Sequence, residues 1–442
     1  MYRTTQPSRT ALRIVAIAAV ISVSAAACGG DDKSSSEPTT LAATTAAPAT
    51  TAASATTAAS ATTAAAGDNS RAGETIKIGY ANNEGPSFSL PEFRIGGEVA
   101  IDYINANGGI NGATLEVVEC INDGSPEGSV NCANKFVDSK VAMYYAGIDI
   151  GADAALPILA GAGIPYVSSH TWGPLQRTEE GSFALHAPAG AYSAGPMQAF
   201  ADFGLKKVTA FSSDTPTGHD FIDNVATPLG KKLGLTVSGV FTNAATPDWN
   251  AAIQSAIAND AEGVWGQLQE SDCIGLVNAA QAASFEGKII AGSCSQFITE
   301  LGKDSVGVYT QADQWIPDTV VDAPPEVQAQ MKIYTDAMTA AGHADIINTF
   351  AESAFAVWME LSTILEGIEG PIDGKAVMDA LSNAKDSPGF LGPNLHCGTA
   401  PWPTEPANCS AGIMLLEVVE GDNGPIRKAV TGKFIDLSTL VS

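Results

Sequence analysis

From residue 75 onward, short runs of β-branched residues alternate with longer stretches of helical pattern. Runs of this length and composition predict strands. The predicted strands cover residues 75–81, 114–121, 142–146, 165–168, 207–212, 235–241, 263–268, 288–291 and 306–310. The predicted helices cover residues 92–107, 126–139, 152–162, 191–203, 218–233, 248–259, 271–285, 324–341, 346–367 and 374–384. Regular alternation of strands and helices predicts βαβ units with parallel sheets, and hence an α/β fold.

The first residues have the pattern of an export signal. Arg3, Arg9 and Arg13 precede a short apolar run at 14–23, and small residues at 24–27 precede Cys28. The apolar run is shorter than the ~20 residues that a membrane-spanning helix needs. We predict that residues 1–27 are a signal peptide and that Cys28, which follows a site resembling a bacterial lipobox, is lipidated. The alternative is an ordinary secretory peptide followed by an unmodified cysteine.

Residues 28–74 are dominated by Ala, Thr and Ser. They show no apolar periodicity that a core could bury, so we predict a disordered linker between the lipidated cysteine and the folded part. The Ala/Thr/Ser-rich part, residues 31 to about 73, has about 43 residues and a root-mean-square reach of roughly 35–40 Å. The expected location is therefore extracytoplasmic, with the chain tethered to the cell membrane by its lipid anchor.

The charge balance argues against several partners. The chain has 22 Lys and Arg against 48 Asp and Glu, a formal net charge of −26. Such an acidic protein should repel nucleic acid and anionic lipid. We therefore expect no nucleic-acid partner and no membrane contact apart from the lipid anchor. The part after residue 74 is longer than a single core usually grows, which predicts two lobes.

Six cysteines remain besides Cys28, and six cysteines allow fifteen pairings. Proximity in sequence favours Cys120–Cys132, Cys273–Cys294 and Cys397–Cys409. Each bridge would close a short loop and contribute about 3 kcal/mol in the chain-entropy model. A zinc site is the competing interpretation, but the chain has no CxxC, and apart from His396 its histidines lie far from the cysteines. We expect no metal and no cofactor.

Residues 96–112 read Gly-Gly-Glu-Val-Ala-Ile-Asp-Tyr-Ile-Asn-Ala-Asn-Gly-Gly-Ile-Asn-Gly. This segment resembles the first-helix signature of the type I periplasmic binding proteins, in the branched-chain amino-acid (Leu/Ile/Val) receptor group of ABC transporters. Further resemblances follow in the order of the family. They lie at the strand 141–147, at Gly161-Ala-Gly-Ile-Pro-Tyr-Val-Ser168, at Asp214-Thr-Pro-Thr-Gly218 and at Thr246-Pro-Asp-Trp249. Cys120 and Cys132 fall where that group often has a disulfide.

The resemblance implies two Rossmann-like lobes whose parallel sheets are joined by hinge strands. We assign residues 75–190 and 313–395 to lobe 1, and residues 191–312 and 396–442 to lobe 2. Ligands of open α/β sheets bind outside the carboxyl ends of the strands, so two such lobes should hold a ligand between them. A monomer is expected.

The resemblance also indicates candidate ligand contacts. The loop 148–151 opens a helix, so the backbone around Ile150 and Gly151 is suited to hold a carboxylate or another acceptor. In the next strand-end loop, the family's contact position falls on His170, Thr171 or Trp172, and Trp172 offers an apolar wall. The remaining candidates are Phe88, where the family has an aromatic residue, and Thr217, Gln267 and Ser295 at strand ends of lobe 2.

The departures from the family bear on the ligand. Thr217 replaces a ligand-facing Tyr, the loop 292–295 has no carboxylate, and the hinge that carries an Asp in amino-acid receptors reads Pro188-Ala-Gly-Ala-Tyr192. An α-ammonium group is costly to bury without an anionic partner. We therefore expect free leucine to bind poorly and a different small organic solute, such as an amide or organic acid, to fit. Trp172→Ala is expected to weaken ligand binding by ~1–3 kcal/mol.

The function predicted from these features is solute capture and delivery to an ABC permease. The alternative is a ligand-sensing receptor ectodomain of the same fold. An enzyme is not expected, because the sequence has no Gly-x-Ser-x-Gly, HExxH, P-loop or GxGxxG motif.

The lipidation hypothesis is testable in cells. Cys28→Ser removes the thiol that the lipid would modify, so the variant should leave the membrane fraction and appear in the medium. Immunoblots of both fractions measure this. Retention of the variant in the membrane at the wild-type level would contradict the hypothesis.

Overall fold

The structure is a computed structural model that describes residues 69–441, apart from 87–88, 267 and 349. The predicted signal peptide, Cys28 and nearly all of the linker lie outside the described residues. The strands are β1 Thr75–Asn83, β2 Thr114–Asn122, β3 Met143–Ala146, β4 Tyr166–Ser168, β5 Ser182–Ala184, β6 Lys207–Ser213, β7 Thr236–Thr242, β8 Gly263–Gly266, β9 Lys288–Ile290, β10 Tyr309–Ala312, β11 Gly412–Gly421, β12 Gly424–Ala429 and β13 Ile435–Asp436.

The longer helices are α1 Pro91–Ala106, α2 Pro126–Ser139, α3 Leu156–Ala162, α5 Ala191–Asp202, α8 Trp249–Ala258, α9 Glu270–Ala282, α11 Pro325–Ala340, α12 Ala351–Glu366 and α13 Gly374–Asn383. Shorter ones are α4 Pro174–Thr178, α6 Pro216–His219, α7 Thr227–Lys232, α10 Gln296–Leu301 and α14 Ser438–Val441, with a π-helical turn at Asp220–Ala226 between α6 and α7. Short 3₁₀ helices lie at Ala152–Ala154, Gly302–Ser305, Pro317–Asp322, Ala344–Ile346 and Cys397–Thr399.

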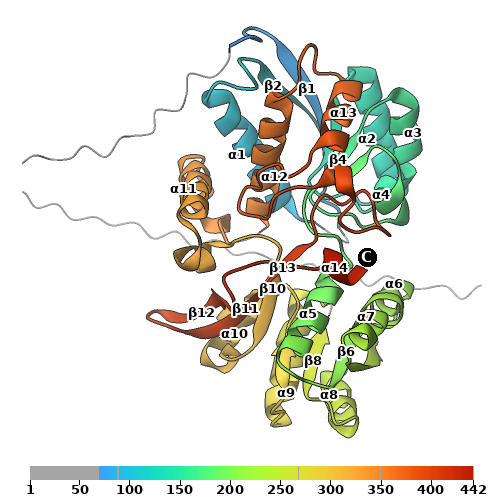
Figure 1. The fold of residues 1–442 in the computed structure, drawn as a ribbon, viewed down its shortest axis with the longest axis vertical. Coiled ribbons are helices and arrows are strands. Elements are labelled where there is room, and N and C mark those ends of the chain that lie inside the picture. Colours follow the sequence, from blue (N-terminus) through green and yellow to red (C-terminus); the bar gives the residue numbers. More distant parts are fainter. Residues whose placement is uncertain (1–68, 87–88, 267, 349, 442) are drawn as a thin grey trace, which may run out of the picture. The chain divides into compact units, whose positions relative to one another are not determined.

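The first sheet is parallel, with strand order β2-β1-β3-β4-β5. Its strands alternate apolar residues toward both faces, as expected of a parallel sheet covered on both sides. Tyr80 and Tyr145 face α1, α12 and α13, where Trp358 packs against both rings. Tyr144 faces the opposite side, where Phe136 of α2 meets it edge to face. Figure 1 shows α1 and α12 on one face and α2 and α3 on the other.

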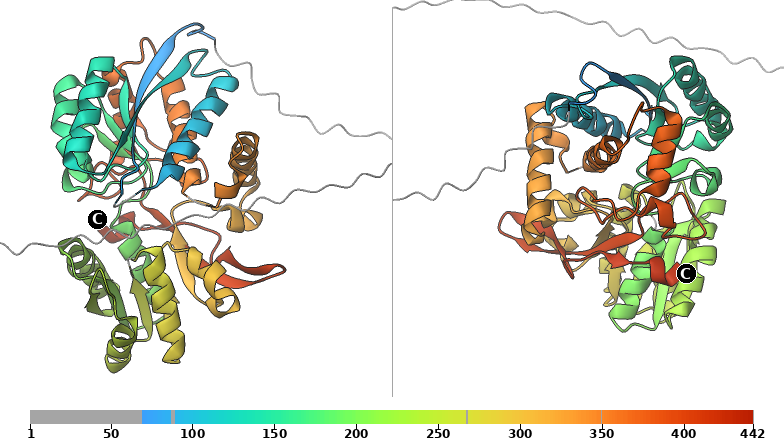
Figure 2. Two further views of the ribbon diagram at one scale, coloured as in Figure 1. Left: turned by 180° about the vertical axis from the view of Figure 1, so that it is seen from behind. Right: turned by 45° about the horizontal axis from the view of Figure 1, so that its top comes forward.

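The second sheet has strand order β12-β11-β10-β9-β8-β6-β7. The strands β6 to β10 are parallel, whereas β11 runs antiparallel to both β10 and β12. β13 pairs with β11. The β11–β12 hairpin forms one edge of this sheet and extends outward in Figure 2. The α/β class and the two parallel sheets predicted from the sequence are thus confirmed.

Among the described residues, the chain passes between the two sheets after β5, after β10 and before β11. The passage after β10 leads into α11, α12 and α13, which cover the first sheet. The stretch before β11 also contacts the first sheet, because Asn408 pairs with Ala184 at the edge of β5. The sequence-based division places this stretch, from residue 396, with lobe 2.

The Gly96-Gly97 pair in the family signature has a packing role. A Cβ atom on Gly96 would lie 2.2 Å from the carbonyl oxygen of Ala351, and one on Gly97 would lie 2.1 Å from the hydroxyl of Tyr80. The two glycines therefore let α1 approach the first turn of α12 and the end of β1. This contact fixes where α12 begins, next to the carboxyl ends of the first sheet.

Several predicted elements differ in detail. The strand predicted at 306–310 begins at Tyr309, and the helix predicted at 218–233 is divided into α6, the π-helical turn and α7. The sequence analysis did not predict β5, β11, β12 and β13. Within the described part of the chain, no helix is long and apolar enough to cross a membrane.

The described cysteines form the disulfides Cys120–Cys132, Cys273–Cys294 and Cys397–Cys409. These are the pairs favoured by sequence proximity. Each joins segments within one region of the fold, since the paired cysteines are separated by 12, 21 and 12 residues respectively.

Thiol titration tests this pairing in the protein. The denatured but unreduced mature protein should show no reactive thiol from these six cysteines, because all six are bonded. Replacing Cys120 and Cys132 together by Ser should lower the free energy of unfolding by about 3 kcal/mol in denaturant titrations. Two or more free thiols in the wild-type protein would contradict the assignment.

Candidate functional site

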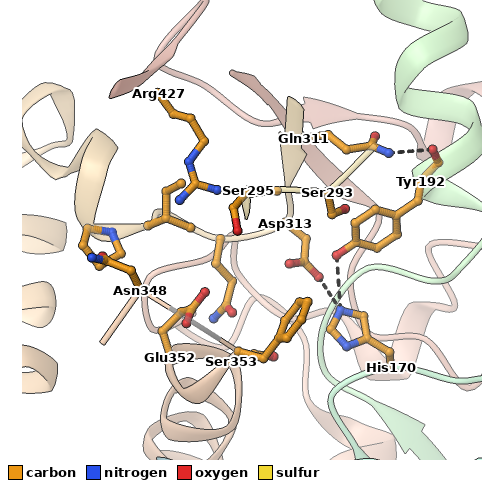
Figure 3. Close-up of a pocket in the computed structure, with 15 residues that line it drawn as sticks. His170, Tyr192, Ser293, Ser295, Gln311, Asp313, Asn348, Glu352, Ser353 and Arg427 are labelled. Atoms are coloured by element: carbon orange, nitrogen blue, oxygen red, sulfur yellow. Dashed lines mark hydrogen bonds and ion pairs between the residues drawn. The ribbon is translucent and has the colours of Figure 1, made fainter. Parts of the chain in front are cut away.

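A pocket of about 90 Å³ lies where residues from both sheets meet. On the side of the first sheet, the pocket is lined by the β4–α4 loop and the first turn of α12. On the side of the second sheet, it is lined by the start of α5, the β9–α10 loop, β10 and β12. The lining residues are His170, Tyr192, Ser293, Ser295, Gln311, Ala312, Asp313, Gln314, Ile316, Pro317, Asn348, Phe350, Glu352, Ser353 and Arg427. Figure 3 shows how these side chains surround the pocket.

Asp313, which directly follows β10, is the centre of the first polar group. Its Oδ2 atom lies 2.9 Å from His170 Nε2 and accepts a hydrogen bond of 3.2 Å from the backbone N–H of Ala187. His170 Nε2 also lies 3.3 Å from the hydroxyl of Tyr192, and Figure 3 shows the three side chains converging. Burial alone would raise the pKa of Asp313, but its contacts with His170 hold that pKa well below its ordinary value. Asp313 is therefore ionised.

A second acid–base pair lies behind this group. His186 Nε2 is 3.5 Å from Glu360 Oε2, and His186 Nδ1 is 3.1 Å from the Ser353 hydroxyl. The backbone N–H of Phe390 donates to the other carboxylate oxygen of Glu360 at 3.0 Å. Both side chains are almost fully buried. Burial raises the pKa of Glu360, while Glu360 raises the pKa of His186 against the opposing effect of burial.

Two acceptor atoms at the pocket have no hydrogen-bond partner among the described residues. They are Glu352 Oε2, in the first turn of α12, and Gln311 Oε1, in β10. The amide nitrogen of Gln311 is in contrast engaged, because it donates to the backbone carbonyl of Tyr192 at 2.8 Å. Burial raises the pKa of Glu352 to about 8. A buried acceptor without a partner is unfavourable, so both atoms are suited to receive a donor from a bound molecule.

Arg427 of β12 brings a positive charge to the same pocket. Its Nε atom donates to Asp318 Oδ2 at 3.0 Å, which fixes the guanidinium at one end. In Figure 3 the guanidinium group points into the pocket near Ser295. The backbone N–H of Ser295 is already paired, since it donates to the carboxylate of Glu270 at 3.0 Å. Arg427 is thus the charged donor available to an anionic group at this pocket.

Of the candidate contacts from the sequence, the structure brings His170 and Ser295 to this pocket. Thr171 is buried with its hydroxyl 3.3 Å from Asn408 Oδ1, and Trp172 is 43% exposed outside the pocket. Ile150 is likewise exposed, and Gly151 lies against the backbone of Ser125.

The contacts of three further candidates lie outside the described part of the structure. Phe88 and Gln267 lie outside the described residues. Thr217 lies in α6, and its side chain is also outside the described part of the structure.

The sequence analysis did not identify Asp313, Glu352, Gln311 and Arg427 as candidates. Asp313 had a recognisable signal, because it is an acidic residue three positions beyond the end of the predicted strand 306–310. Glu352 lies in the first turn of α12, where an acidic residue is common, and this is a weaker signal. Arg427 lies in a hairpin that was not predicted.

The raised pKa of Glu352 gives a test of this geometry. Its carboxyl holds a proton more tightly in the folded protein, with a pKa of about 8, than at its ordinary value of 4.5. The stability it contributes is present below pH 4.5 and is lost as the pH rises towards 8. That loss is at most about 1.4 kcal/mol per pH unit.

Glutamine does not titrate, so the Glu352→Gln variant should not lose stability in this window. The difference between its free energy of unfolding and that of the wild type should therefore increase in favour of the variant as the pH rises. Urea unfolding at about pH 5 and about pH 8 measures this. Glu326→Gln, an exposed substitution in α11, is the control and should follow the wild type. Parallel pH curves for the Glu352→Gln variant and the wild type would show that Glu352 is not buried as described.

Comparison with known proteins places this architecture in a family. The family model of the periplasmic binding proteins matches residues 75–399. No curated protein sequence matches the chain. An ABC transporter substrate-binding protein from Sphaerobacter thermophilus is 19% identical with a TM-score of 0.66, and the alignment covers 83% of this chain and 100% of that one.

Two further solved structures are similar. The branched-chain amino acid transporter substrate binding protein LivJ from Streptococcus pneumoniae, in complex with isoleucine, is 19% identical with a TM-score of 0.62, covering 81% of this chain and 99% of that chain. The leucine binding protein LivK from Thermotoga maritima is 16% identical with a TM-score of 0.62, covering 80% and 98% respectively. These likenesses show the fold that the sequence resemblance implies.

Proteins of this family bind solutes and are not enzymes, which confirms the expectation from the absence of catalytic motifs. The family model spans most of the chain, and the two-sheet fold agrees with it. The chain belongs to the periplasmic binding proteins.

Proposed function

We propose that this protein is an extracytoplasmic solute-binding lipoprotein that captures a small organic solute in the pocket beside Asp313 and delivers it to an ABC permease. The observation that carries the proposal is the unpartnered acceptor pair, Glu352 Oε2 and Gln311 Oε1, at the pocket that Arg427 also lines. The family match and the export pattern of residues 1–28 support the location and the transport role.

The chemistry of the pocket favours an amino-acid-like solute. Glu352 and Gln311 offer acceptors to an ammonium or amide N–H, while Arg427 offers a donor to a carboxylate or carbonyl oxygen. Phe350 supplies an apolar surface beside these groups; it is 43% exposed and stacks on Phe93 at 5.7 Å between ring centroids. The pocket is small, so the solute is expected to be of amino-acid size.

The carboxylate of Glu352 changes the sequence-based argument about leucine. That argument rests on the uncharged loop 292–295, which has no partner for an α-ammonium. Glu352 approaches the pocket from α12 instead, so an ammonium group has a partner here from another element. The proposal therefore rests on the polar groups of the solute and leaves its side chain open.

Calorimetric titration tests both the solute class and the site. The panel includes leucine, isoleucine and valine, their amides, and the matching acids that lack the amino group. Solutes with an N–H donor should bind more tightly than acids of the same carbon skeleton. Glu352→Gln should weaken binding of the best solute by about 1.5–3 kcal/mol, because a charged hydrogen bond is lost. Arg427→Gln should selectively weaken the solutes that carry a carboxylate.

Glu366→Gln is the matched control, since Glu366 lies at the far end of the same helix α12 and is exposed. It should bind like the wild type. If Glu352→Gln and Arg427→Gln both bind the best solute as tightly as the control does, the solute does not occupy this pocket.

A further inference from the structure

Two histidines and one carboxylate come together at the floor of the pocket. One ring nitrogen each from His170 and His186 and one carboxylate oxygen of Asp313 all lie within 4.8 Å of one another. His170 is partly exposed to the pocket, whereas His186 and Asp313 are buried. The three residues come from the β4–α4 loop, the passage after β5 and the passage after β10. We propose that His170, His186 and Asp313 form a binding site for a divalent transition-metal ion such as Zn²⁺.

The ligand set suits such an ion. Imidazole nitrogen and carboxylate oxygen bind zinc at about 2.0–2.2 Å, so neighbouring ligand atoms of a tetrahedral site lie about 3.3 Å apart. His170 Nε2 and Asp313 Oδ2, at 2.9 Å, already lie near that spacing. The third ligand atom lies within 4.8 Å, and small side-chain rotations close the difference. Two imidazoles and one carboxylate leave a fourth position, where a water molecule or a solute can bind.

A simple hydrogen-bonded pair between His170 and Asp313 does not account for the whole cluster. That pair leaves out His186, a histidine that is 3% exposed and has an acidic neighbour of its own beside its Nε2 atom. The nearest acidic group to that nitrogen is Glu360, at 3.5 Å. A carboxylate beside one ring nitrogen is a common arrangement behind metal-binding histidines, because it orients the ring and sets which nitrogen carries the proton. A metal ion would give both histidines one shared function.

The backbone holds the cluster in place. Asp313 accepts the backbone N–H of Ala187, the neighbour of His186, so two of the three ligands are tied to each other through the main chain. The His186 nitrogen that binds the ion gives up its present neighbour, and the other nitrogen keeps its own, which is Glu360 at 3.5 Å for Nε2 or the Ser353 hydroxyl at 3.1 Å for Nδ1. Such outer contacts reduce the rearrangement that metal binding requires. The site lies on the passages between the two sheets, and His170 and Asp313 also line the pocket.

The experiment uses the untagged, full mature protein and zinc alone, so it does not depend on the proposed solute. The protein is stripped with a chelator, dialysed against zinc, and analysed for bound metal. The wild type should retain one zinc per chain and unfold at a higher temperature with zinc than without. His170→Ala and His186→Ala should each weaken zinc binding by at least about tenfold.

The matched control is His219→Ala. His219 is an exposed imidazole at 3.0 Å from Asp214 and 3.3 Å from Asp223, so it tests for binding by surface histidine–carboxylate pairs. The control should retain zinc at the wild-type level. Cobalt(II) absorption of the wild-type protein gives a second measurement that needs no variant, because a tetrahedral site with nitrogen and oxygen ligands produces intense visible bands.

The outcomes separate cleanly. One retained zinc with cobalt bands, both lost in His170→Ala, supports the site. A wild-type protein that retains no zinc and gives no cobalt bands would overturn it, and so would zinc binding by His170→Ala equal to that of the wild type. Zinc lost in His219→Ala would place the metal on the surface instead and would equally overturn the proposal.

Discussion

The buried carboxylate of Asp313 needs a partner, and this need determines how the segments between the two sheets are held together. Asp313 is ionised although it is only 8% exposed, and an unpaired charge at such a position would cost several kcal/mol. Its partners are His170, 143 residues earlier in the chain, and the backbone of Ala187, 126 residues earlier. The pairing therefore fixes a loop of the first sheet against the two passages that lead to and from the second. The pairing of Asp313 with His170 and Ala187 thus holds the floor of the pocket in place.

Sequence patterns were sufficient for the framework because local rules govern it. Parallel strands buried on both faces are near-continuous apolar runs, and β3, β6 and β8 stand out in that way. The disulfides were also accessible, since each closes a short loop. β5 was missed because its residues, Ser182–Ala184, include no β-branched residue that would mark a strand. β11 is long and apolar, but it lies in the last part of the chain, beyond the strand–helix alternation on which the prediction was based.

The site was harder to predict for a topological reason. The rule that ligands bind at the carboxyl ends of strands points to the loops of His170 and Ser295, and both residues line the pocket. It does not identify residues that arrive by other routes. Glu352 comes from a helix that covers the first sheet after the chain has returned from the second, and Arg427 comes from an antiparallel edge hairpin. Glu352 and Arg427 are far apart in the sequence, and nothing in the local sequence pattern indicates that they meet at one pocket. Their proximity there depends on the points at which the chain passes from one sheet to the other.

The same pocket holds two carboxylates in different states, and the difference comes from their neighbours. Asp313 has His170 beside it, which outweighs burial and keeps it ionised. Glu352 Oε2 has no hydrogen-bond partner among the described residues, and burial raises the pKa of this carboxyl to about 8. His170 stabilises the ionised form of Asp313. A bound cation or N–H donor would stabilise the ionised form of Glu352 in the same way and would lower the pKa of Glu352. The strongly negative net charge of the chain is therefore a poor guide to its ligand, because one carboxylate at the pocket is already paired with His170 and the other is available for a donor.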